Sequence, residues 1–547
     1  MSKAFAQLSG DPSVSDGAAV LTASWLASSA PQANAVSIPR SEPQRSDLPR
    51  IIADLDADEI AARIAAWRAD SRQLDALFRE NAPPAQALRR LALTQWSAGY
   101  PRVASVILAT AAAIAPDSAA LWLELGFTLQ AAGDQSDARE AFERSVALDP
   151  APARAWLGLA MLANELGDKK QAEAAFTAAL ERDPKLSEAT FGLGLICFEQ
   201  RRYTEAATHW RAAIAAGCQN PNVHVGLGQS LFFAGDFSGA ARAFARHIAS
   251  GPADPNIIQR FALTRFLETA IAEDTEAAHE AYRRAAGAHA VEPKIVAQSA
   301  FSLLSGYGYR EAALRIGRER LSNDGDDPVQ RYLLDAIAGV KLARAPHDYL
   351  VSYFDHFAEG FDKQLVEVLG YRVPEQLMEM IAATGARLTR AVDLGCGTGL
   401  AGPGLRAARS RLVGVDLSPR MLAKAAERGC YDALIEADMM TFLEQTSERF
   451  DLVFAADTLV YLGELEYFFA AAARVATPDG LLAFNIETTA LPGWVLLPSG
   501  RFAHCLEAVL ASAAPWFILG SSQPAFLRVE ANKRVHGALV LLERRQD

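Results

Sequence analysis

The chain carries a glycine-rich turn directly after a short apolar run in its C-terminal third. The residues of this turn are Asp393-Leu394-Gly395-Cys396-Gly397-Thr398-Gly399. Because glycine has no Cβ, the backbone at Gly395, Gly397 and Gly399 can approach a bound molecule closely. In an open α/β sheet, ligands bind beyond the carboxyl ends of the strands. The turn therefore predicts a cofactor site, with Asp393 placed to face a positively charged group of the cofactor.

Two further acidic residues follow later apolar runs. Asp416 comes at the end of the second run, 23 residues after Asp393 (416 − 393), and Asp438 comes three residues after the third (438 − 435). A carboxylate after the second strand of such a sheet can accept hydrogen bonds from ribose hydroxyls. Asp438 is placed to accept a hydrogen bond from an adenine amino group, with Leu417 and Met421 packing on the ring. Together, the acidic residues predict an adenosyl ligand.

Candidates for reaction chemistry follow the fourth and fifth apolar runs. Asp457 comes directly after the fourth run, with Tyr461 four residues further on, and Arg501 and His504 lie in a loop after the fifth. Arg501 could clamp a carboxylate, His504 could act as a base, and Glu487 could bind a cationic substrate. We predict Asp457, Tyr461, Arg501 and His504 as the catalytic set. The alternatives are that Asp457 caps the next helix and that His504 is a surface residue of its helix.

An aromatic segment precedes the first apolar run. Tyr353, Phe357 and Phe361 recur at four-residue steps and therefore share one face of a helix. This face either packs against the sheet or covers the cofactor and closes the site, and we favour the second interpretation. A cover that excludes water strengthens electrostatic control of the reacting atoms.

The elements that must position these residues are strands alternating with helices. Helical stretches separate five short apolar runs at residues 391–394, 412–415, 433–435, 452–456 and 481–486. This alternation predicts a parallel sheet with helices on both faces. Two last runs, at residues 526–529 and 538–542, are joined by too short a link for a helical crossover and predict an antiparallel hairpin.

These glycines and acidic strand ends resemble the binding set of class I S-adenosylmethionine (SAM) dependent methyltransferases. The resemblance covers residues 349–545 and implies a Rossmann-like α/β domain with a seven-stranded sheet. It implies SAM as the cofactor, with its methionine amino group at Asp393. The implied cofactor-binding residues are Tyr353, Phe361, Asp393, Gly395, Gly397, Gly399, Asp416, Leu417, Met421, Asp438, Met439 and Asp457.

A rival interpretation uses the same glycines. Residues 397–402 also fit the pattern GxGxxG, and Asp416 follows at a distance suited to a ribose, as in dinucleotide-binding domains. Asp393, Asp438, the terminal hairpin and the lack of chain for a separate substrate domain argue against an NAD-linked oxidoreductase. A third alternative is a non-catalytic module that keeps the SAM fold.

The N-terminal half repeats with a period of 34 residues. Alanines at this step are each followed, four residues later, by a large apolar residue; the pairs are Ala104/Leu108, Ala138/Phe142, Ala172/Phe176, Ala206/Trp210 and Ala240/Phe244. Glycines keep the same step, with Arg201 as the one exception. Period and residue types resemble the tetratricopeptide repeat (TPR), a helix-turn-helix unit. The whole chain is similar to bacterial methyltransferases with N-terminal TPR repeats.

The resemblances imply four regions and a partner surface. We expect a disordered tail at residues 1–47, a TPR solenoid at 48–255, degenerate repeats that form a connector at 256–345 and the methyltransferase domain at 346–547. Stacked repeats form a concave surface that holds peptides or proteins in most such proteins. The alternative is a solenoid that serves as a scaffold or a homo-oligomer interface, with a small-molecule acceptor. The sequence does not identify the acceptor.

The length and composition of the chain restrict the classes of protein to which it can belong. At 547 residues the chain is too long for one core, and a formal charge of −12 argues against general affinity for nucleic acid or anionic membrane. The five cysteines form no CxxC pair and have no histidine at ligand spacing, so we expect no metal site and reduced thiols in a cytoplasm. No signal peptide is visible, and the most apolar stretch, residues 103–115, is too short to span a bilayer.

Overall fold

The computed structural model describes residues 57–70, 83–325, 327–362, 371–407, 411–530 and 533–546. The chain divides into two compact units, with the division between Thr264 and Arg265, inside helix α15 (Pro255–Ala272). The predicted tail at residues 1–47 and the predicted helical positions Leu74 and Leu77 lie outside the described residues. The predicted domain boundaries stay predictions.

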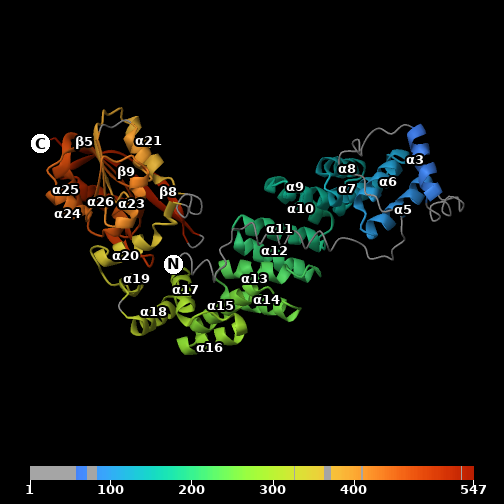
Figure 1. Cartoon of the computed structure of the whole chain (residues 1–547), viewed down its shortest axis with the longest axis horizontal. Coiled ribbons are helices and arrows are strands. Elements are labelled where there is room, and N and C mark those ends of the chain that lie inside the picture. Colours follow the sequence, from blue (N-terminus) through green and yellow to red (C-terminus); the bar gives the residue numbers. More distant parts are fainter. Residues whose placement is uncertain are drawn as a thin grey trace. The chain divides into compact units, whose positions relative to one another are not determined.

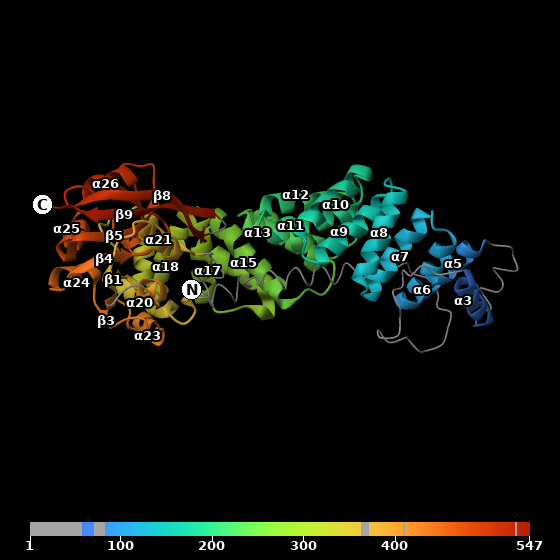
Figure 2. The ribbon, with the colours of Figure 1, turned by 90° about the horizontal axis from the view of Figure 1, so that it is seen from above.

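The first unit consists of consecutive helix pairs (Figures 1 and 2). The first helices of the pairs are α5 (Pro84–Ser97), α7 (Ala119–Ala132), α9 (Ala153–Glu165), α11 (Ser187–Glu199) and α13 (Val223–Phe233). The second helices are α6 (Pro101–Ile114), α8 (Gln135–Leu148), α10 (Lys169–Arg182), α12 (Tyr203–Ala215) and α14 (Phe237–Ala249). Because each second helix begins 34 residues after the one before it, the predicted repeat is confirmed. Helix α3 (Ala57–Asp70) precedes these pairs.

Small residues permit the close approach of the paired helices. A Cβ at Gly126 would lie 2.5 Å from the ring of Phe142, and one at Gly228 would lie 2.7 Å from the ring of Phe244. All ten side chains of the alanine and large apolar pairs are buried. Substituting alanine for either glycine would therefore force the facing ring to move.

Glycines in the left-handed region end several first helices of the pairs. Gly133, Gly167 and Gly235 have φ angles of 85°, 82° and 83°. Arg201, the exception to the glycine pattern, adopts the same conformation with φ 60°. A non-glycine residue pays roughly 1–2 kcal/mol for this conformation, so the repeat geometry here overrides local preference.

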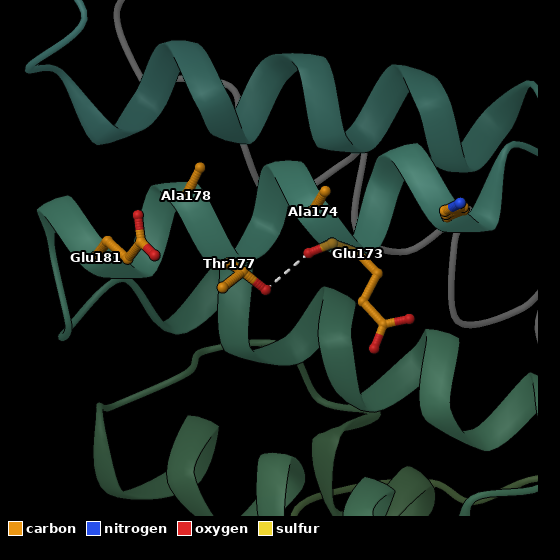
Figure 3. Close-up of a pocket in the computed structure, with 6 residues that line it drawn as sticks. Glu173, Ala174, Thr177, Ala178 and Glu181 are labelled. Atoms are coloured by element: carbon orange, nitrogen blue, oxygen red, sulfur yellow. Dashed lines mark hydrogen bonds between the residues drawn. The ribbon is translucent and has the colours of Figure 1, made fainter.

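A hollow of about 490 Å³ lies on the solenoid along α10. Figure 3 shows the residues of this helix that line it, and Thr177 donates a hydrogen bond to the backbone of Glu173 at 2.8 Å. The lining residues are Lys170, Glu173, Ala174, Thr177, Ala178 and Glu181. The hollow contains none of the predicted site residues.

Helices continue into the second unit after α15. They are α16 (Thr275–Ala286), α17 (Pro293–Gly306), α18 (Arg310–Asp324) and α19 (Pro328–Ala338). The sequence predicts the last helix over residues 329–342, but α19 ends earlier because Gly339 takes a left-handed φ of 75°. Helix α18 ends at Asp324.

The described residues of the second unit form a nine-stranded sheet. Its order is β3-β2-β1-β4-β5-β7-β6, and β9 pairs with both β5 and β8. The strands are β1 (Arg390–Leu394), β2 (Arg411–Asp416), β3 (Ala433–Glu436), β4 (Phe450–Ala455), β5 (Ala476–Thr488), β6 (Trp494–Leu496), β7 (Phe502–His504), β8 (Phe517–Glu530) and β9 (Lys533–Arg544). Strands β1 to β5 are parallel, and the β8–β9 hairpin joins them antiparallel along β5.

This topology confirms the predicted fold class. The seven expected strands are β1–β5, β8 and β9, and the short pair β6–β7 adds two more beside the end of β5. Helices pack on both faces: α24 (Met439–Gln445), α25 (Glu466–Val475) and α26 (Leu506–Ala513) on one, and α21 (Val373–Ala383) and α22 (Gly402–Arg406) on the other. The two apolar cores leave the carboxyl ends of the parallel strands to polar residues.

Candidate functional site

The glycine turn lies across the ends of β1 and β2. The backbone N–H groups of Gly395 and Cys396 both donate to the carbonyl of Val415, at 2.7 and 3.0 Å. Gly395, Gly397 and Gly399 all have left-handed φ angles, of 67°, 54° and 79°. The turn therefore depends on glycine for its backbone conformation as well as for close approach.

Protein atoms crowd the two ends of the turn but not its centre. A Cβ at Gly395 would lie 2.6 Å from Oγ1 of Thr458, and one at Gly399 would lie 3.0 Å from the ring of Tyr431. At Gly397 the nearest atom is Cε1 of Phe361, at 3.9 Å. The turn is thus fixed at both ends and leaves a space at its centre that a bound molecule can fill.

Asp416 fixes the centre of the turn. Its carboxylate accepts hydrogen bonds from the backbone N–H groups of Gly397, at 2.8 Å, and Ser418, at 2.9 Å. Burial raises the pKa of Asp416 above its usual value, although these backbone hydrogen bonds act in the opposite direction. Ser418 in turn caps helix α23 (Pro419–Glu427) by accepting from the N–H of Met421.

Asp393 is buried at the end of β1. It is 2% exposed and accepts a hydrogen bond from the hydroxyl of Tyr431 at 2.7 Å. Burial raises the pKa of Asp393 to about 7; the Tyr431 hydrogen bond lowers it, and the neighbouring Asp416 raises it further. A cation placed beside this carboxyl would favour its charged form.

Asp438 caps the next helix at the end of β3. Its carboxylate accepts from the N–H groups of Met440, at 3.0 Å, and Thr441, at 3.2 Å, and pairs with Arg344. An adenine amino group at the predicted position would therefore share this carboxylate with two backbone N–H groups and Arg344.

The apolar residues predicted for the adenine ring differ in exposure. Leu417 and Met439 are half-buried, whereas Met421 has no exposed surface. Leu417 and Met439 can present surface to a ring. In the described structure Met421 lies beneath the site.

The aromatic segment lies beside the glycine turn. It begins in helix α20 (His347–Phe357), and the rings of Tyr353 and Phe357 are 4.8 Å apart. Asp362 accepts hydrogen bonds from Thr398 in the turn and from Arg428, which ties the segment to the cofactor side. Tyr353, Phe357 and Phe361 are all half-buried, as expected of residues that pack on protein while keeping surface toward a ligand.

A buried charged cluster follows strand β4. Asp457 has a left-handed φ of 54°, and its N–H donates to Oδ1 of Asn485 at 2.6 Å. Arg501 donates to the Asp457 carboxylate at 2.9 Å, so Asp457 pairs with arginine instead of capping the following helix. Strained backbone at a non-glycine residue is frequent at functional sites.

A second ion pair completes this cluster. Arg528 of β8 donates to Oε1 of Glu487 at 2.5 Å, and both side chains are 4% exposed. Arg501 lies 3.7 Å from the same carboxylate, and Arg528 lies 3.9 Å from Asp457. The sequence predicts that Glu487 binds a cationic substrate, but two arginines already neutralise the charge of its carboxylate.

The pKa shifts in the cluster disfavour a strong base. Burial raises the pKa of Asp457, but Arg501 and Arg528 outweigh it, and the net pKa lies below the usual value. Burial also raises the pKa of Tyr461 well above its usual value. Asp457 therefore stays ionised and Tyr461 stays protonated, so these residues can orient an acceptor and donate hydrogen bonds.

His504 lies in β7, not in a helix, and it is 2% exposed. The alternative that it is a surface residue is therefore wrong. Its Nε2 lies 3.2 Å from the carbonyl oxygen of Gly463, and burial lowers its pKa below the usual value although backbone hydrogen bonds raise it. The lowered pKa favours a neutral histidine. Its predicted role as a base stays a prediction.

Sequence reasoning missed several polar partners of the site. Asn485, Arg528 and Tyr431 contact Asp457, Glu487 and Asp393, respectively. The only signal for Arg528 is a charged residue in an otherwise apolar run, which indicates a buried pair when the run is a strand.

The fold is that of an α/β methyltransferase domain, and two family models match parts of the chain. The residue range 392–484 matches the family model described as methyltransferase domain, and the ranges 123–186, 165–221 and 191–256 match that of the tetratricopeptide repeat. The chain therefore combines TPR repeats with a methyltransferase domain. This match favours the methyltransferase over the NAD-linked alternative.

Known proteins with these features match parts of the chain. Trans-aconitate 2-methyltransferase of Escherichia fergusonii is 32% identical over 141 residues, which are 25% of this chain and 51% of the relative. Malonyl-[acyl-carrier protein] O-methyltransferase of Halorhodospira halophila is 32% identical over 136 residues, or 24% of this chain and 45% of the relative. The chain thus spans about half the length of the curated relatives it matches. Among solved structures, the N-methyltransferase NodS of Bradyrhizobium japonicum in complex with S-adenosyl-L-homocysteine (SAH) is 16% identical, covers 36% of this chain and 99% of its own, and has a TM-score of 0.31.

Among the described residues, no cluster of three or more His, Cys, Asp or Glu side chains could hold a metal ion. Over the same part of the chain, no helix combines the length and apolar character needed to cross a membrane.

Proposed function

We propose that the chain is a SAM-dependent methyltransferase whose TPR solenoid recruits a protein or peptide acceptor or partner. The observation that carries the enzymatic part is the open position at Gly397, whose N–H donates to the carboxylate of Asp416 at the end of the next strand. Titration of the full chain with SAH in a calorimeter tests it. We expect saturable binding at one site per chain, and absence of heat at millimolar SAH would refute the proposal.

The residue types at the strand ends suit the charged and apolar groups of SAM. SAM supplies an electrophilic methyl group on a positively charged sulfur, so transfer needs alignment more than covalent help from protein. We assign the methionine amino group to Asp393, the ribose hydroxyls to Asp416 and the adenine to Leu417, Met439 and Asp438. Gly397 leaves the backbone accessible to the ligand, and the aromatic segment with Tyr353 and Phe361 covers it.

The charged cluster after β4 and β5 is the proposed acceptor side. Arg501 is 18% exposed in its side chain, pairs with Asp457 and stacks its guanidinium 5.7 Å from the ring centre of Tyr461. This arrangement holds a guanidinium rigidly while leaving part of its surface accessible. Arg501 and Tyr461 are thus the residues that we assign to acceptor contact, with Asp457 holding Arg501 in place.

The same cluster favours a second candidate function, a small-molecule methyltransferase with repeats used for assembly. A guanidinium suits an acceptor that carries a carboxylate, because the two form charge-assisted hydrogen bonds. The names of the two curated relatives above specify trans-aconitate and a malonyl group, which are both carboxylic acids. An ionised carboxylate needs no base, in agreement with the pKa shifts of Asp457 and His504.

A labelling experiment separates the two candidates. A cell lysate is incubated with the full chain and SAM that carries a labelled methyl group, and the label is then measured in protein and small-molecule fractions. Label in protein that disappears on proteolysis supports a protein or peptide acceptor, as the first candidate requires. Label confined to small molecules supports the second candidate, and SAH binding without label in either fraction supports a non-catalytic module.

A further inference from the structure

Helix α19 contacts the loop that carries Arg501. Its residue Tyr332 is 1% exposed, and its hydroxyl donates to the carbonyl oxygen of Gly500 at 3.0 Å. This carbonyl belongs to the peptide unit that joins Gly500 to Arg501. The two partners are 168 residues apart in the chain, and Tyr332 precedes the segment that matches the methyltransferase family.

Packing reinforces this hydrogen bond. The ring of Tyr332 lies 4.3 Å, centre to centre, from that of Tyr349 in α20. A Cβ on Gly500 would come within 3.1 Å of both Tyr332 and Leu333, so α19 presses directly on the loop backbone. Packing against Tyr349 therefore holds the ring of Tyr332 in place, and its hydroxyl donates to the carbonyl oxygen of Gly500.

The contacted loop is a tight turn that directs Arg501 into the cluster. The N–H of Gly500 donates to Leu497 at 2.9 Å, and the N–H of Leu497 donates to Arg501 at 2.8 Å. Arg501 then reaches Asp457 at 2.9 Å. A rotation of the Gly500–Arg501 peptide would therefore displace the guanidinium that faces the acceptor.

The segment after α19 holds the other side of the cluster. The N–H of Ala345 donates to the carbonyl of Tyr461 at 2.9 Å, and the N–H of Gly463 donates to the carbonyl of Ala343 at 2.7 Å. Between them, Arg344 forms a β-bridge with Leu462 and an ion pair with Asp438. The loop after β4 and the loop that carries Arg501 thus both contact residues 328–345.

We infer that Tyr332 is a positioning residue of the acceptor site, and that α19 with residues 343–345 is part of the catalytic unit. This inference rests on the proposed function, because only that function makes the charged cluster an acceptor site. The contact between Tyr332 and Gly500 belongs to the fold and does not depend on the function. The hydroxyl of Tyr332 acts through the Gly500–Arg501 peptide, whereas its ring belongs to an apolar cluster against which Tyr353 and Leu417 pack. Loss of its hydroxyl should therefore weaken acceptor binding and leave cofactor binding unchanged.

The test compares Tyr332→Phe with Tyr282→Phe in the full chain. Tyr282 is a matched control, because it is also buried in a helix of the same unit and its hydroxyl also bonds a backbone group, the N–H of Val291 at 3.2 Å. Hydrogen exchange of the peptide that contains residues 497–501 is measured together with SAH titration. Labelling of lysate acceptors is followed at increasing lysate concentration.

We expect Tyr332→Phe to speed exchange at the Gly500 amide about fivefold, which corresponds to the loss of one hydrogen bond of ~1 kcal/mol. The lysate concentration for half-maximal labelling should rise by a similar factor, with the maximal rate and the SAH affinity unchanged. Tyr282→Phe should change none of these quantities. Equal exchange and equal labelling in the two variants would overturn the inference.

The result also separates this inference from the proposed function. If the wild-type chain fails to bind SAH, the proposed function fails, but the exchange at residues 497–501 still decides whether Tyr332 holds the loop. If SAH binds and exchange is unaffected in Tyr332→Phe, only the positioning role fails.

Discussion

The open centre of the glycine turn gives a sharp test through Gly397→Ala. Gly397 has a φ of 54°, and a Cβ there meets only the Phe361 ring, at an ordinary van der Waals distance of 3.9 Å. The added methyl group is therefore accommodated by the protein itself but projects into the space assigned to the cofactor. A matched control is Gly385→Ala, because Gly385 has a φ of 66°, has nothing within 4 Å and precedes β1 at the opposite end of the sheet.

The structure gives the two variants similar folding costs. Alanine in the left-handed region costs roughly 1–2 kcal/mol, and the reduced entropy of the unfolded chain returns about 0.4–1 kcal/mol. Both variants should therefore lose about 1 kcal/mol of unfolding free energy. For a unit of this size, that loss lowers Tm by about 2–4 °C.

Cofactor binding should separate the two variants. Inserting a methyl group into a filled space costs typically 1–3 kcal/mol, so Gly397→Ala should raise the Kd for SAH by about 5- to 150-fold. Gly385→Ala should leave the Kd unchanged. Calorimetric titration with SAH measures both, and differential scanning calorimetry checks that the Tm losses match.

Two outcomes would refute the reasoning about Gly397. Unchanged SAH affinity in Gly397→Ala would show that the ligand does not approach the centre of the turn. An equal loss of affinity in Gly385→Ala would show that backbone strain, and not the position of the methyl group, weakens binding.

Four further predictions follow from three other residues, Asp393, Arg201 and Asp457. Asp393, with its pKa raised to about 7, should lose its proton when a cation binds beside it. SAH titrations at pH 7 should therefore release about half a proton, and the affinity for SAH should rise from pH 6 to 8. An affinity for SAH that does not depend on pH would contradict this. The same raised pKa lowers the stability of the ligand-free fold as pH rises from about 4 to 7, because the folded state holds the proton longer. Arg201→Gly should stabilise the solenoid by about 0.5–1 kcal/mol in urea unfolding, and a loss of stability would refute the strain argument at φ 60°. Asp457→Asn should lower the unfolding free energy by about 3 kcal/mol, because it leaves buried arginines without one carboxylate; a change below about 1 kcal/mol would show that the pair is screened.

Several features of the site could be predicted because they depend on neighbours in the chain. Glycines with left-handed φ, such as Gly395 and Gly397, are visible as a turn after an apolar run. Parallel strands place their carboxyl ends on one edge of a sheet, so the spacing of Asp393, Asp416 and Asp438 along the chain is enough to predict that they lie near one another. The 34-residue period likewise predicts the helix pairs, including the exceptional position of Arg201.

Other features depend on residues that are distant in sequence. Nothing near Tyr332 in the sequence indicates that its hydroxyl bonds Gly500, 168 residues later. The pairing of Arg528 with Glu487 arises only when β9 brings β8 to the edge of β5, and the burial of His504 arises only when β7 joins the same strand. The sequence alone therefore determined the glycine turn and the acidic strand ends, because local backbone geometry builds them. Tertiary structure decided the charged cluster after β4 and β5, because long-range packing sets which charges are paired and buried.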